Sequence, residues 1–239
     1  YMIHGLSTIK PAIPEFQLKD LEIQWQSKVP EKMGLGSSAA IAVALVKACN
    51  QHFQAQLTED LIWQIAREIE NYAHGNSSGL DPACALHDAL LSYQKGVITP
   101  LNFKPPPMTI IDCGPTKSTT TDCVKHAQQY FESTQSLCKD FVDIVELMEQ
   151  GLSQQSKSMM AAAMTKNHQL LCRIGVVPPK VKKIIDHLNH RGIAAKICGG
   201  GSIANDGGGT VWAMTQENLQ EVLQTHDAKV IEVSENEFY

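Results

Sequence analysis

Two glycines and two serines in the segment Gly34-Leu35-Gly36-Ser37-Ser38 have the composition of a loop that binds a phosphate group. Glycine permits backbone torsions and close approaches that a Cβ atom would prevent. The apolar run over residues 37–50 predicts a buried helix, and the first amides of a helix have no partner within it. Because free amides and the helix dipole attract anions, this segment predicts an anion-binding cradle.

The glycine pair is also compatible with a plain turn and with a dinucleotide-binding loop. A bare glycine pair before a helix is more often a simple turn than a binding site. Gly34, Gly36 and Ala39 fit the G-x-G-x-x-A pattern of dinucleotide-binding folds, but Pro30 separates the loop from the strand-like residues 21–27. No acidic residue closes a second strand about 20 positions later, as that fold requires. No G-x-x-x-x-G-K-[ST] sequence occurs, which excludes a Walker loop.

A pair of carboxylates, Glu70 and Asp81, flanks a turn that contains glycines. Phosphoryl transfer needs a metal ligand to neutralise phosphate charge and a group that orients or deprotonates the attacking hydroxyl. Taken alone, Glu70 is typical of a solvated helix end, and Asp81 of a turn before proline. The nearby His74 is more typical of a structural loop histidine than of a catalytic one.

Three segments together resemble the motifs of the GHMP kinases. Residues 30–40 fit P-x-x-x-G-L-G-S-S-A-A without a gap, and residues 74–81 fit the H-G-x-x-S-G-x-D sequence of the mevalonate kinase branch. Residues 196–202, followed by the glycines at 207–209, resemble K-x-T-G-A-G-x-G-G-C, with Cys198 and Gly200 in place of threonine and alanine. Residues 203–206 fill what is normally a shorter stretch. By itself, the third segment predicts a tight glycine turn between two strands. The resemblance covers about residues 22–215.

The resemblance implies an α+β fold with two lobes. The N-terminal lobe, similar to ribosomal protein S5, would cover residues 1–105, and a ferredoxin-like lobe would cover residues 106–239. ATP would be bound by glycine-rich residues, namely Gly34, Leu35, Gly36, Ser37, Ser38, Ala39, Gly199, Gly200 and Gly201.

The family resemblance also assigns chemical roles. Ser38 and Glu70 would bind Mg²⁺, and Asp81 would act on the substrate hydroxyl as general base or orienting group. Residues 112–119 resemble a family turn that would place Thr119 near the substrate, although a Ser-Thr pair before a helix is ordinarily a cap.

The implied reaction is the ATP-dependent phosphorylation of the 5-hydroxyl of mevalonate, a step in isoprenoid precursor synthesis. A sister kinase acting on phosphomevalonate, homoserine or a sugar is an alternative, and a non-catalytic ligand sensor is another. The family's N-terminal P-G-K motif, which bears a lysine, has no match here. We therefore expect the given sequence to begin after that motif. A homodimer is left open.

Composition supports a folded protein with a small-molecule partner. The chain has 239 residues, of which 43% are hydrophobic and 19% charged, and its net charge of −5 gives no electrostatic support for nucleic-acid or anionic-membrane binding. Seven scattered cysteines without a C-x-x-C pair predict reduced, mostly buried thiols. No apolar run approaches a membrane span and no signal-peptide pattern opens the chain, so we expect a cytoplasmic location.

Hydrophobic periodicity predicts the elements that position these motifs. Thr58 is a predicted N-cap with Glu59 and Asp60 in the first turn, and three prolines at 105–107 predict a domain boundary. Strands are expected at residues 21–27, 108–113, 193–198, 209–214 and 228–233. Helices are expected at residues 37–50, 59–73, 121–151 (one or two), 154–173 and 178–190.

Overall fold

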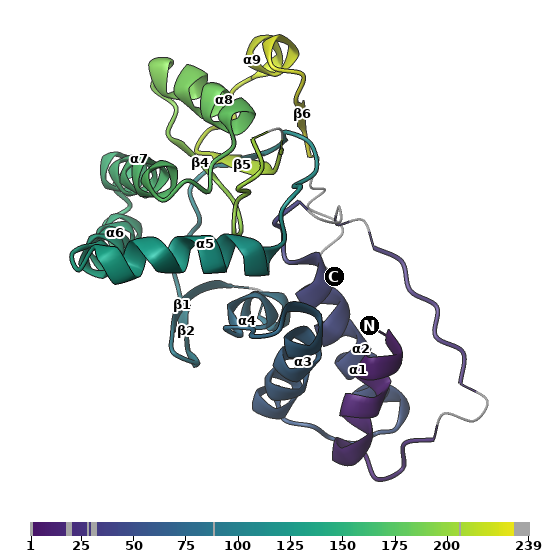
Figure 1. Cartoon of the computed structure of the whole chain (residues 1–239). Coiled ribbons are helices and arrows are strands. Elements are labelled where there is room, and N and C mark those ends of the chain that lie inside the picture. The colour runs from purple at the N-terminus through teal and green to yellow at the C-terminus, as the bar shows by residue number, and fades with distance from the viewer. Residues whose placement is uncertain are drawn as a thin grey trace. The chain divides into compact units, whose positions relative to one another are not determined.

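The computed structural model describes residues 2–17, 21–27, 29, 33–87, 89–205 and 207–231, without the side chains of residues 73 and 74 (Figure 1). The chain forms two compact units. Unit 1 contains Tyr1–Glu31 and Gly36–Asn102, and unit 2 contains Lys32–Leu35 and Phe103–Tyr239. The glycine loop is therefore divided, with Gly34 and Leu35 in unit 2 and the residues from Gly36 onward in unit 1.

Unit 1 is mainly helical. Its elements are α1 (Met2–Ile9), the 3₁₀ helix η1 (Lys10–Ala12), α2 (Ser37–His52), α3 (Glu59–His74), α4 (Leu80–Leu86), and the antiparallel hairpin of β1 (Leu90–Gln94) and β2 (Val97–Leu101). The apolar faces of α1, α2 and α3 share a core in which Ile9, Val46 and Ile69 are fully buried. Thr58 caps α3 as predicted, because its side chain accepts a hydrogen bond from the Leu61 amide.

The predicted strand at residues 21–27 is wrong. This segment lies extended, and Ile23 packs on the core of unit 1, but no described strand pairs with it. An alternating pattern produces a strand only where a neighbouring strand supplies the hydrogen-bond ladder. Trp25, in the same segment, is 51% exposed.

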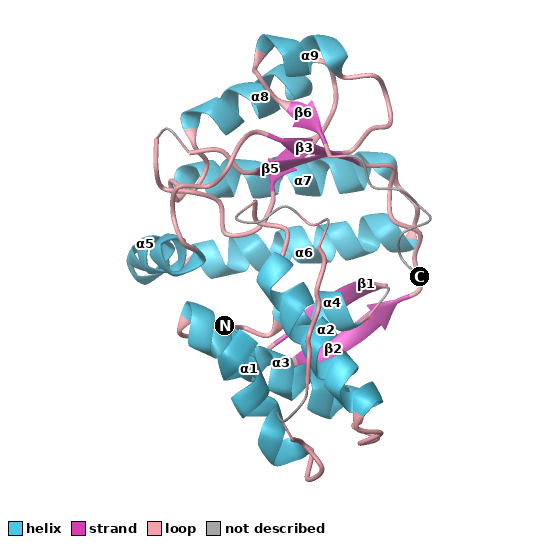
Figure 2. Ribbon diagram, turned by 90° about the vertical axis from the view of Figure 1, so that its right-hand side faces the viewer, coloured by secondary structure: helices cyan, strands magenta, loops and turns pink. Residues whose placement is uncertain are grey.

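Unit 2 contains a four-stranded antiparallel sheet with the strand order β4-β5-β3-β6. Its strands β5, β3 and β6 are labelled side by side in Figure 2. The strands are β3 (Thr109–Asp112), β4 (Ala195–Ile197), β5 (Thr210–Ala213) and β6 (Lys229–Val230). The helices are α5 (Thr120–Ser133), α6 (Leu137–Ser153), α7 (Lys157–Arg173), α8 (Pro179–His190) and α9 (Gln220–Thr225). In chain order, helices separate β3 from β4 and α9 separates β5 from β6, which gives the β-α-β-β-α-β order of a ferredoxin-like lobe.

The core of unit 2 confirms the predicted apolar face of α8. Val181, Ile184, Ile185 and Leu188 are all fully buried in a cluster that includes strand residues such as Ile111. The predicted helical region 121–151 is two helices, α5 and α6. The last predicted strand is short, since β6 ends at Val230 and residues 232–233 lie outside the described part.

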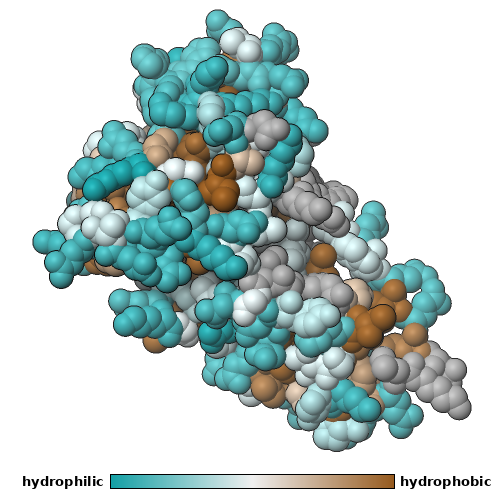
Figure 3. Space-filling view, viewed as in Figure 1, coloured by the Kyte–Doolittle hydropathy of each residue, from teal (hydrophilic) through white to brown (hydrophobic). Residues whose placement is uncertain are grey.

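The surface over α8 and α9 is polar (Figure 3), and the cysteines are unpaired. The face seen in Figure 3 is largely hydrophilic over α8 and α9. No helix among the described residues is long and apolar enough to cross a membrane. All seven cysteines are free, but the prediction of mostly buried thiols is wrong. Cys49, Cys113 and Cys123 are buried, Cys172 and Cys198 are intermediate, and Cys84 and Cys138 are exposed.

Candidate active site

The second glycine of the loop starts helix α2. Gly36 is the N-cap, with a φ of 67°, and its carbonyl accepts the first helical hydrogen bond from the Ala40 amide at 3.0 Å. Its left-handed conformation is available to glycine at little cost. No acidic residue lies in the first turn, so the helix dipole and the leading amides of Ser37, Ser38 and Ala39 are not opposed by a carboxylate of that turn.

The first glycine of the loop touches the third glycine-rich segment within unit 2. A Cβ atom on Gly199 would lie 2.8 Å from both the Cα and the carbonyl oxygen of Gly34. A Cβ atom on Gly34 would lie 3.0 Å from the Cys198 carbonyl oxygen. Two backbones can approach this closely only where both residues lack side chains. The structure thus brings together Gly34 and Gly199, two members of the ATP-binding set that the resemblance implies.

A buried threonine fixes the start of the glycine loop. Thr210, at the beginning of β5, is 0% exposed, and its hydroxyl donates a 2.7 Å hydrogen bond to the Met33 carbonyl. Sequence reasoning missed Thr210, which lies far along the chain from Met33. Its position after Gly207-Gly208-Gly209 was the only local signal.

The third glycine-rich segment is not the tight hairpin that its sequence predicts. The connection between β4 and β5 runs over residues 198–209 and bonds to neighbouring loops. The Ser202 amide donates to the Val176 carbonyl at 2.9 Å, and the Gly209 amide donates to the Gly114 carbonyl at 2.7 Å. Glycine here serves contacts with other segments rather than a two-residue turn.

Residues at the start of α5 lie beside this segment. A Cβ atom on Gly200 would lie 3.5 Å from Thr120 Cγ2. Thr119 is the N-cap of α5 and forms a capping box with Asp122, whose carboxylate also accepts a 2.6 Å hydrogen bond from the Thr119 hydroxyl. The hydroxyl that the resemblance places near the substrate is therefore engaged in capping.

Asp81 lies against the glycine loop within unit 1. It occupies the second position of α4, and a Cβ atom on Gly36 would lie 3.7 Å from both Cβ and Cγ of Asp81. The Asp81 residue is exposed, so its carboxylate can reach a ligand. Burial, followed by the charge of Asp81, raises the pKa of the Cys84 thiol one turn later. Within unit 1, the structure thus places the Asp81 carboxylate next to the start of the predicted anion-binding cradle.

Glu70 is not the solvated helix-end residue that its sequence position alone would predict. It lies in α3 and is 3% exposed. A buried carboxylate is retained only where it interacts with other groups. Its helix packs closely on α2, which carries Ser38 in its first turn.

Four side chains that sequence reasoning missed hold the turn before Asp81. Residues 77–79 each present a carbonyl to a different donor: Arg67 Nε bonds to Ser77 at 3.1 Å, Tyr93 Oη to Ser78, and Trp63 Nε1 to Gly79 at 2.9 Å. The Ser77 amide donates to Asn71 Oδ1 at 2.7 Å.

The spacing of three of these four residues is visible in the sequence. Trp63, Arg67 and Asn71 recur every four residues, which places them on one stripe of α3. The side chain of His74, also in this motif, lies outside the described part.

Two protein-family profiles match this chain. The profile described as GHMP kinases N terminal domain matches residues 4–88, and the profile described as GHMP kinases C terminal matches residues 144–229. The chain belongs to the GHMP kinase family. Both profiles match in the family's order, so the resemblance of the glycine loop is not that of an isolated motif.

Curated relatives of this GHMP kinase chain are named mevalonate kinase. One from Pyrococcus horikoshii is 28% identical over 212 residues, which cover 84% of this chain and 62% of the relative. One from Archaeoglobus fulgidus is 30% identical over 199 residues, covering 81% of this chain and 65% of the relative. Within the family the chain is therefore similar to the mevalonate kinases. It spans less than two thirds of the length of these relatives.

Solved structures show the same fold. The crystal structure of Methanococcus jannaschii mevalonate kinase matches with a TM-score of 0.76 and 22% identity, covering 97% of this chain and 73% of that one. The structure of L. major mevalonate kinase in complex with R-mevalonate matches with a TM-score of 0.73 and 20% identity, covering 94% and 71%. The chain has the GHMP kinase fold.

The donor chemistry of this GHMP kinase chain suits a hard cation. Among the described residues, no group of three or more His, Cys, Asp or Glu side chains could hold a metal ion. Mg²⁺ does not require such a cage, since it usually binds through one or two carboxylates, substrate phosphates and water. The Glu70 carboxylate and the Ser38 hydroxyl supply oxygen donors of the kind it prefers.

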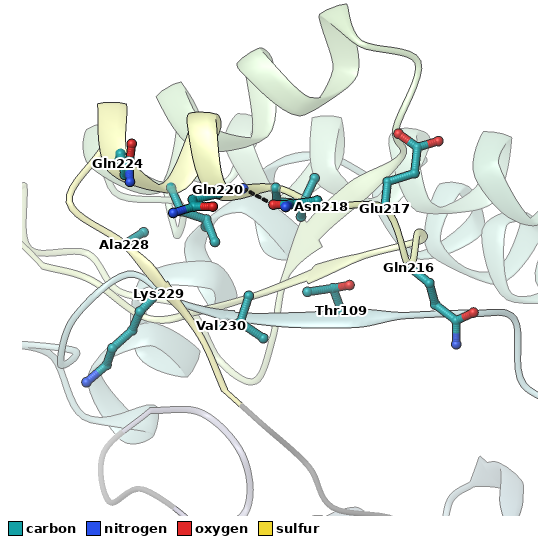
Figure 4. A pocket seen from close by; sticks show the side chains of 11 residues that line it. Thr109, Gln216, Glu217, Asn218, Gln220, Gln224, Ala228, Lys229 and Val230 are labelled. Atoms are coloured by element: carbon teal, nitrogen blue, oxygen red, sulfur yellow. Dashed lines mark hydrogen bonds between the residues drawn. The ribbon is translucent and has the colours of Figure 1, made fainter.

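A separate groove of about 490 Å³ lies beside α9 and the β3–β6 edge of unit 2 (Figure 4). Amide side chains such as Gln216 and Gln224 line it, and Asn218 Oδ1 accepts a 2.8 Å hydrogen bond from the Gln220 amide. None of the residues that the motifs single out lines this groove. It is distinct from the candidate active site.

Proposed function

We propose that the protein transfers the γ-phosphate of ATP to the 5-hydroxyl of mevalonate. The observation that carries this proposal is the placement of the Asp81 carboxylate against Gly36, the residue that starts helix α2. A group that handles the attacking hydroxyl must lie beside the group that holds the phosphates. The relatives named mevalonate kinase support the choice of substrate.

Each motif has a role in this reaction. The amides of Ser37, Ser38 and Ala39 would bind phosphate oxygens, and the Gly34 region would be kept in place by its contact with Gly199. Leu35, Gly200 and Gly201 complete the ATP-binding set. Asp81 would orient the hydroxyl or accept its proton as the bond to phosphorus forms. Catalysis would come from positioning and from fixed dipoles directed at the phosphate charge.

Mg²⁺ is the proposed metal, held by Glu70 and Ser38 together with ATP. When bound, it would neutralise charge on the β- and γ-phosphates. Thr119 is the proposed residue near the substrate, and its hydroxyl is bonded to Asp122.

Replacing Glu70 with glutamine tests the metal assignment. Glu70→Gln keeps the shape of the side chain and removes its charge, so we expect ATP to bind more weakly and to need more Mg²⁺. The measurement is ATP affinity by calorimetry over a range of Mg²⁺ concentrations. Glu59→Gln, at an exposed residue in the first turn of the same helix, is the matched control. An unchanged Mg²⁺ dependence in Glu70→Gln would remove Glu70 from the metal site.

The substrate is tested by ADP release from the full-length protein. The assay contains ATP, Mg²⁺ and, in separate reactions, mevalonate, phosphomevalonate, homoserine or galactose. Turnover with mevalonate alone supports the proposal. Turnover with another member of the panel shows a sister kinase and overturns the substrate assignment. ATP binding without turnover on any of them would favour a non-catalytic sensor.

The remaining proposals concern organisation and location. We propose that residues 1–105 and 106–239 are the two lobes, which is supported by compact units that divide between Asn102 and Phe103. A cytoplasmic location is supported by seven free cysteines, since thiols persist in reducing compartments. We also propose a homodimer, which light scattering of the full-length protein tests.

A further inference from the structure

Side chains form more hydrogen bonds to the turn that precedes Asp81 than a turn of this length requires. It joins α3 to α4 over residues 75–79, and the carbonyls of residues 77, 78 and 79 all accept hydrogen bonds from side chains. A short loop of this kind could leave its carbonyls to water. Three successive carbonyls with separate donors indicate a backbone whose position is specified.

The donors come from two elements of unit 1. Trp63 and Arg67 stand one turn apart on α3, and the Arg67 guanidinium lies 5.6 Å from the centre of the Trp63 ring, within range of a cation–π contact. Tyr93 reaches the turn from β1. Asn71, a further turn along α3, accepts from the Ser77 amide. Side chains thus hold the turn through three of its carbonyls and one of its amides.

Three of these side chains converge on a single glycine. Gly79 has a φ of +89°, and a Cβ atom there would lie 2.6 Å from Trp63 Cζ2, 2.9 Å from Tyr93 Oη and 3.1 Å from Arg67 Cδ. Gly79 is also the N-cap of α4, and its carbonyl accepts the hydrogen bond from the Ala83 amide. We call the four side chains that bond to this turn (Trp63, Arg67, Asn71 and Tyr93) the clamp. The clamp therefore acts on the residue from which α4 starts.

Asp81 is two residues beyond this fixed point. Its Cγ lies 3.7 Å from the place where a Cβ of Gly36 would stand, so a small displacement of α4 would move the carboxylate away from the glycine loop. Misplacing a reacting group by about 1 Å can reduce a rate about 100-fold. A clamp at Gly79 would prevent such a displacement.

We infer that Trp63, Arg67, Asn71 and Tyr93 are positioning residues that hold Asp81 beside the glycine loop. This inference rests on the proposed function, in which Asp81 acts on the substrate hydroxyl. None of the four needs to touch the substrate. Their effect on the reaction passes through the turn at residues 75–79.

Two conservative variants of the full-length protein test the inference. Trp63→Phe removes the indole N–H, and Tyr93→Phe removes only the hydroxyl. Each should lower kcat for mevalonate about ten- to hundred-fold, with the KM for ATP unchanged within about two-fold. The controls, Trp25→Phe and Tyr72→Phe, make the same changes at exposed side chains, and they should keep full activity.

A double-mutant cycle separates positioning from general damage. In an Asp81→Asn background, Trp63→Phe and Tyr93→Phe should cause no further loss of the residual rate, measured by transfer of labelled phosphate. An equal loss in both backgrounds, or a normal kcat in the single variants, would overturn the inference. Should Trp63→Phe fail to fold, Tyr93→Phe carries the test, because it removes a single oxygen atom.

Hydrogen exchange gives a result that does not depend on activity. In the variants, the Ser77 and Gly79 amides should exchange at least about ten-fold faster than in the control variants, while helix α2 is unchanged. If the wild-type protein turned over no member of the substrate panel, the proposed function would fail. Hydrogen exchange would then still test whether the clamp holds the turn. Unaltered exchange at residues 77–79 would overturn it.

Discussion

The turn at residues 75–79 and the connection at residues 198–209 are both rich in glycine, but the contacts that each makes nearest the glycine loop differ. In unit 1, side chains from α3 and β1 grip the turn by its carbonyls. In unit 2, the Ser118 hydroxyl accepts hydrogen bonds from two amides of the connection, but the contact with the glycine loop is between backbones, because Gly199 lies directly on Gly34.

The difference determines how each region should respond to mutation. A clamp made of several hydrogen bonds weakens by steps, because each donor can be removed separately. A backbone contact between two glycines has no such steps, since any Cβ atom must displace one of the two segments. Catalytic rate should therefore be sensitive to the first region, and ATP affinity to the second.

The largest effect is expected at the residue that the turn positions. Asp81→Asn keeps the shape of the side chain but removes its negative charge, and should reduce kcat about 10²- to 10⁴-fold. ATP affinity, measured by calorimetry, should change little, because the loop contacts of unit 2 are untouched. Asp227→Asn, at an exposed side chain, is the control. Near-normal turnover of Asp81→Asn would remove Asp81 from the chemistry.

A methyl group at Gly199 tests the other side of the comparison. Gly199→Ala would place Cβ 2.8 Å from Gly34 and should weaken ATP binding at least ten-fold. Backbone strain at its φ of +62° adds about 1–3 kcal/mol of destabilisation.

Gly192→Ala is the matched control for this substitution. Gly192 has a φ of +77°, but no atom lies within 4 Å of its Cβ position. The Gly192→Ala variant should therefore show the backbone strain without the loss of ATP affinity. Equal ATP affinities in the two alanine variants would show that the Gly34 contact is unimportant for binding.

A smaller effect is expected from the buried hydroxyl beneath the loop. Thr210→Val leaves the Met33 carbonyl without its donor and should lower the free energy of unfolding by about 1–3 kcal/mol. Urea unfolding measures it, with Thr225→Val, at an exposed threonine that bonds to the Glu221 carbonyl, as the control. If both variants are equally stable, the hydroxyl of Thr210 does not anchor Met33.

The smallest effect concerns a histidine of unit 2 that neither region uses. His168 is 4% exposed, and its burial lowers its pKa below the usual value of about 6.5, with Asp186 opposing and Lys182 and Lys196 adding to the shift. The unfolded chain therefore binds a proton at about pH 6.5 that the folded protein takes up only at lower pH. Stability should fall as the pH decreases through this window.

Urea unfolding at several pH values checks this expectation. His168→Gln should reduce the loss of stability below about pH 6.5, whereas His52→Gln, at an exposed side chain, should leave it unchanged. The same pH dependence in all three proteins would show that His168 is not the group responsible. Kinetic constants measured near neutral pH should not respond to either substitution.

Local patterns predicted much of the secondary structure. The Thr58 cap and the four buried residues of α8 depend on contacts between neighbours in the chain, so their spacing is visible in the sequence. The strand predicted at residues 21–27 failed because a strand needs a partner from elsewhere in the chain. The tight turn predicted between β4 and β5 failed because those glycines serve contacts with distant segments.

For the candidate site, the amino-acid sequence determined which groups are present and in what order. It contains a glycine loop before an apolar helix, a carboxylate on each side of a turn, and a second glycine-rich segment. Only the tertiary structure decided that Asp81 lies against Gly36, that Gly34 meets Gly199, and that α3 and β1 clamp the turn. The physical reason is that residue spacing encodes contacts within one helix or strand, whereas contacts between elements depend on how whole faces pack together.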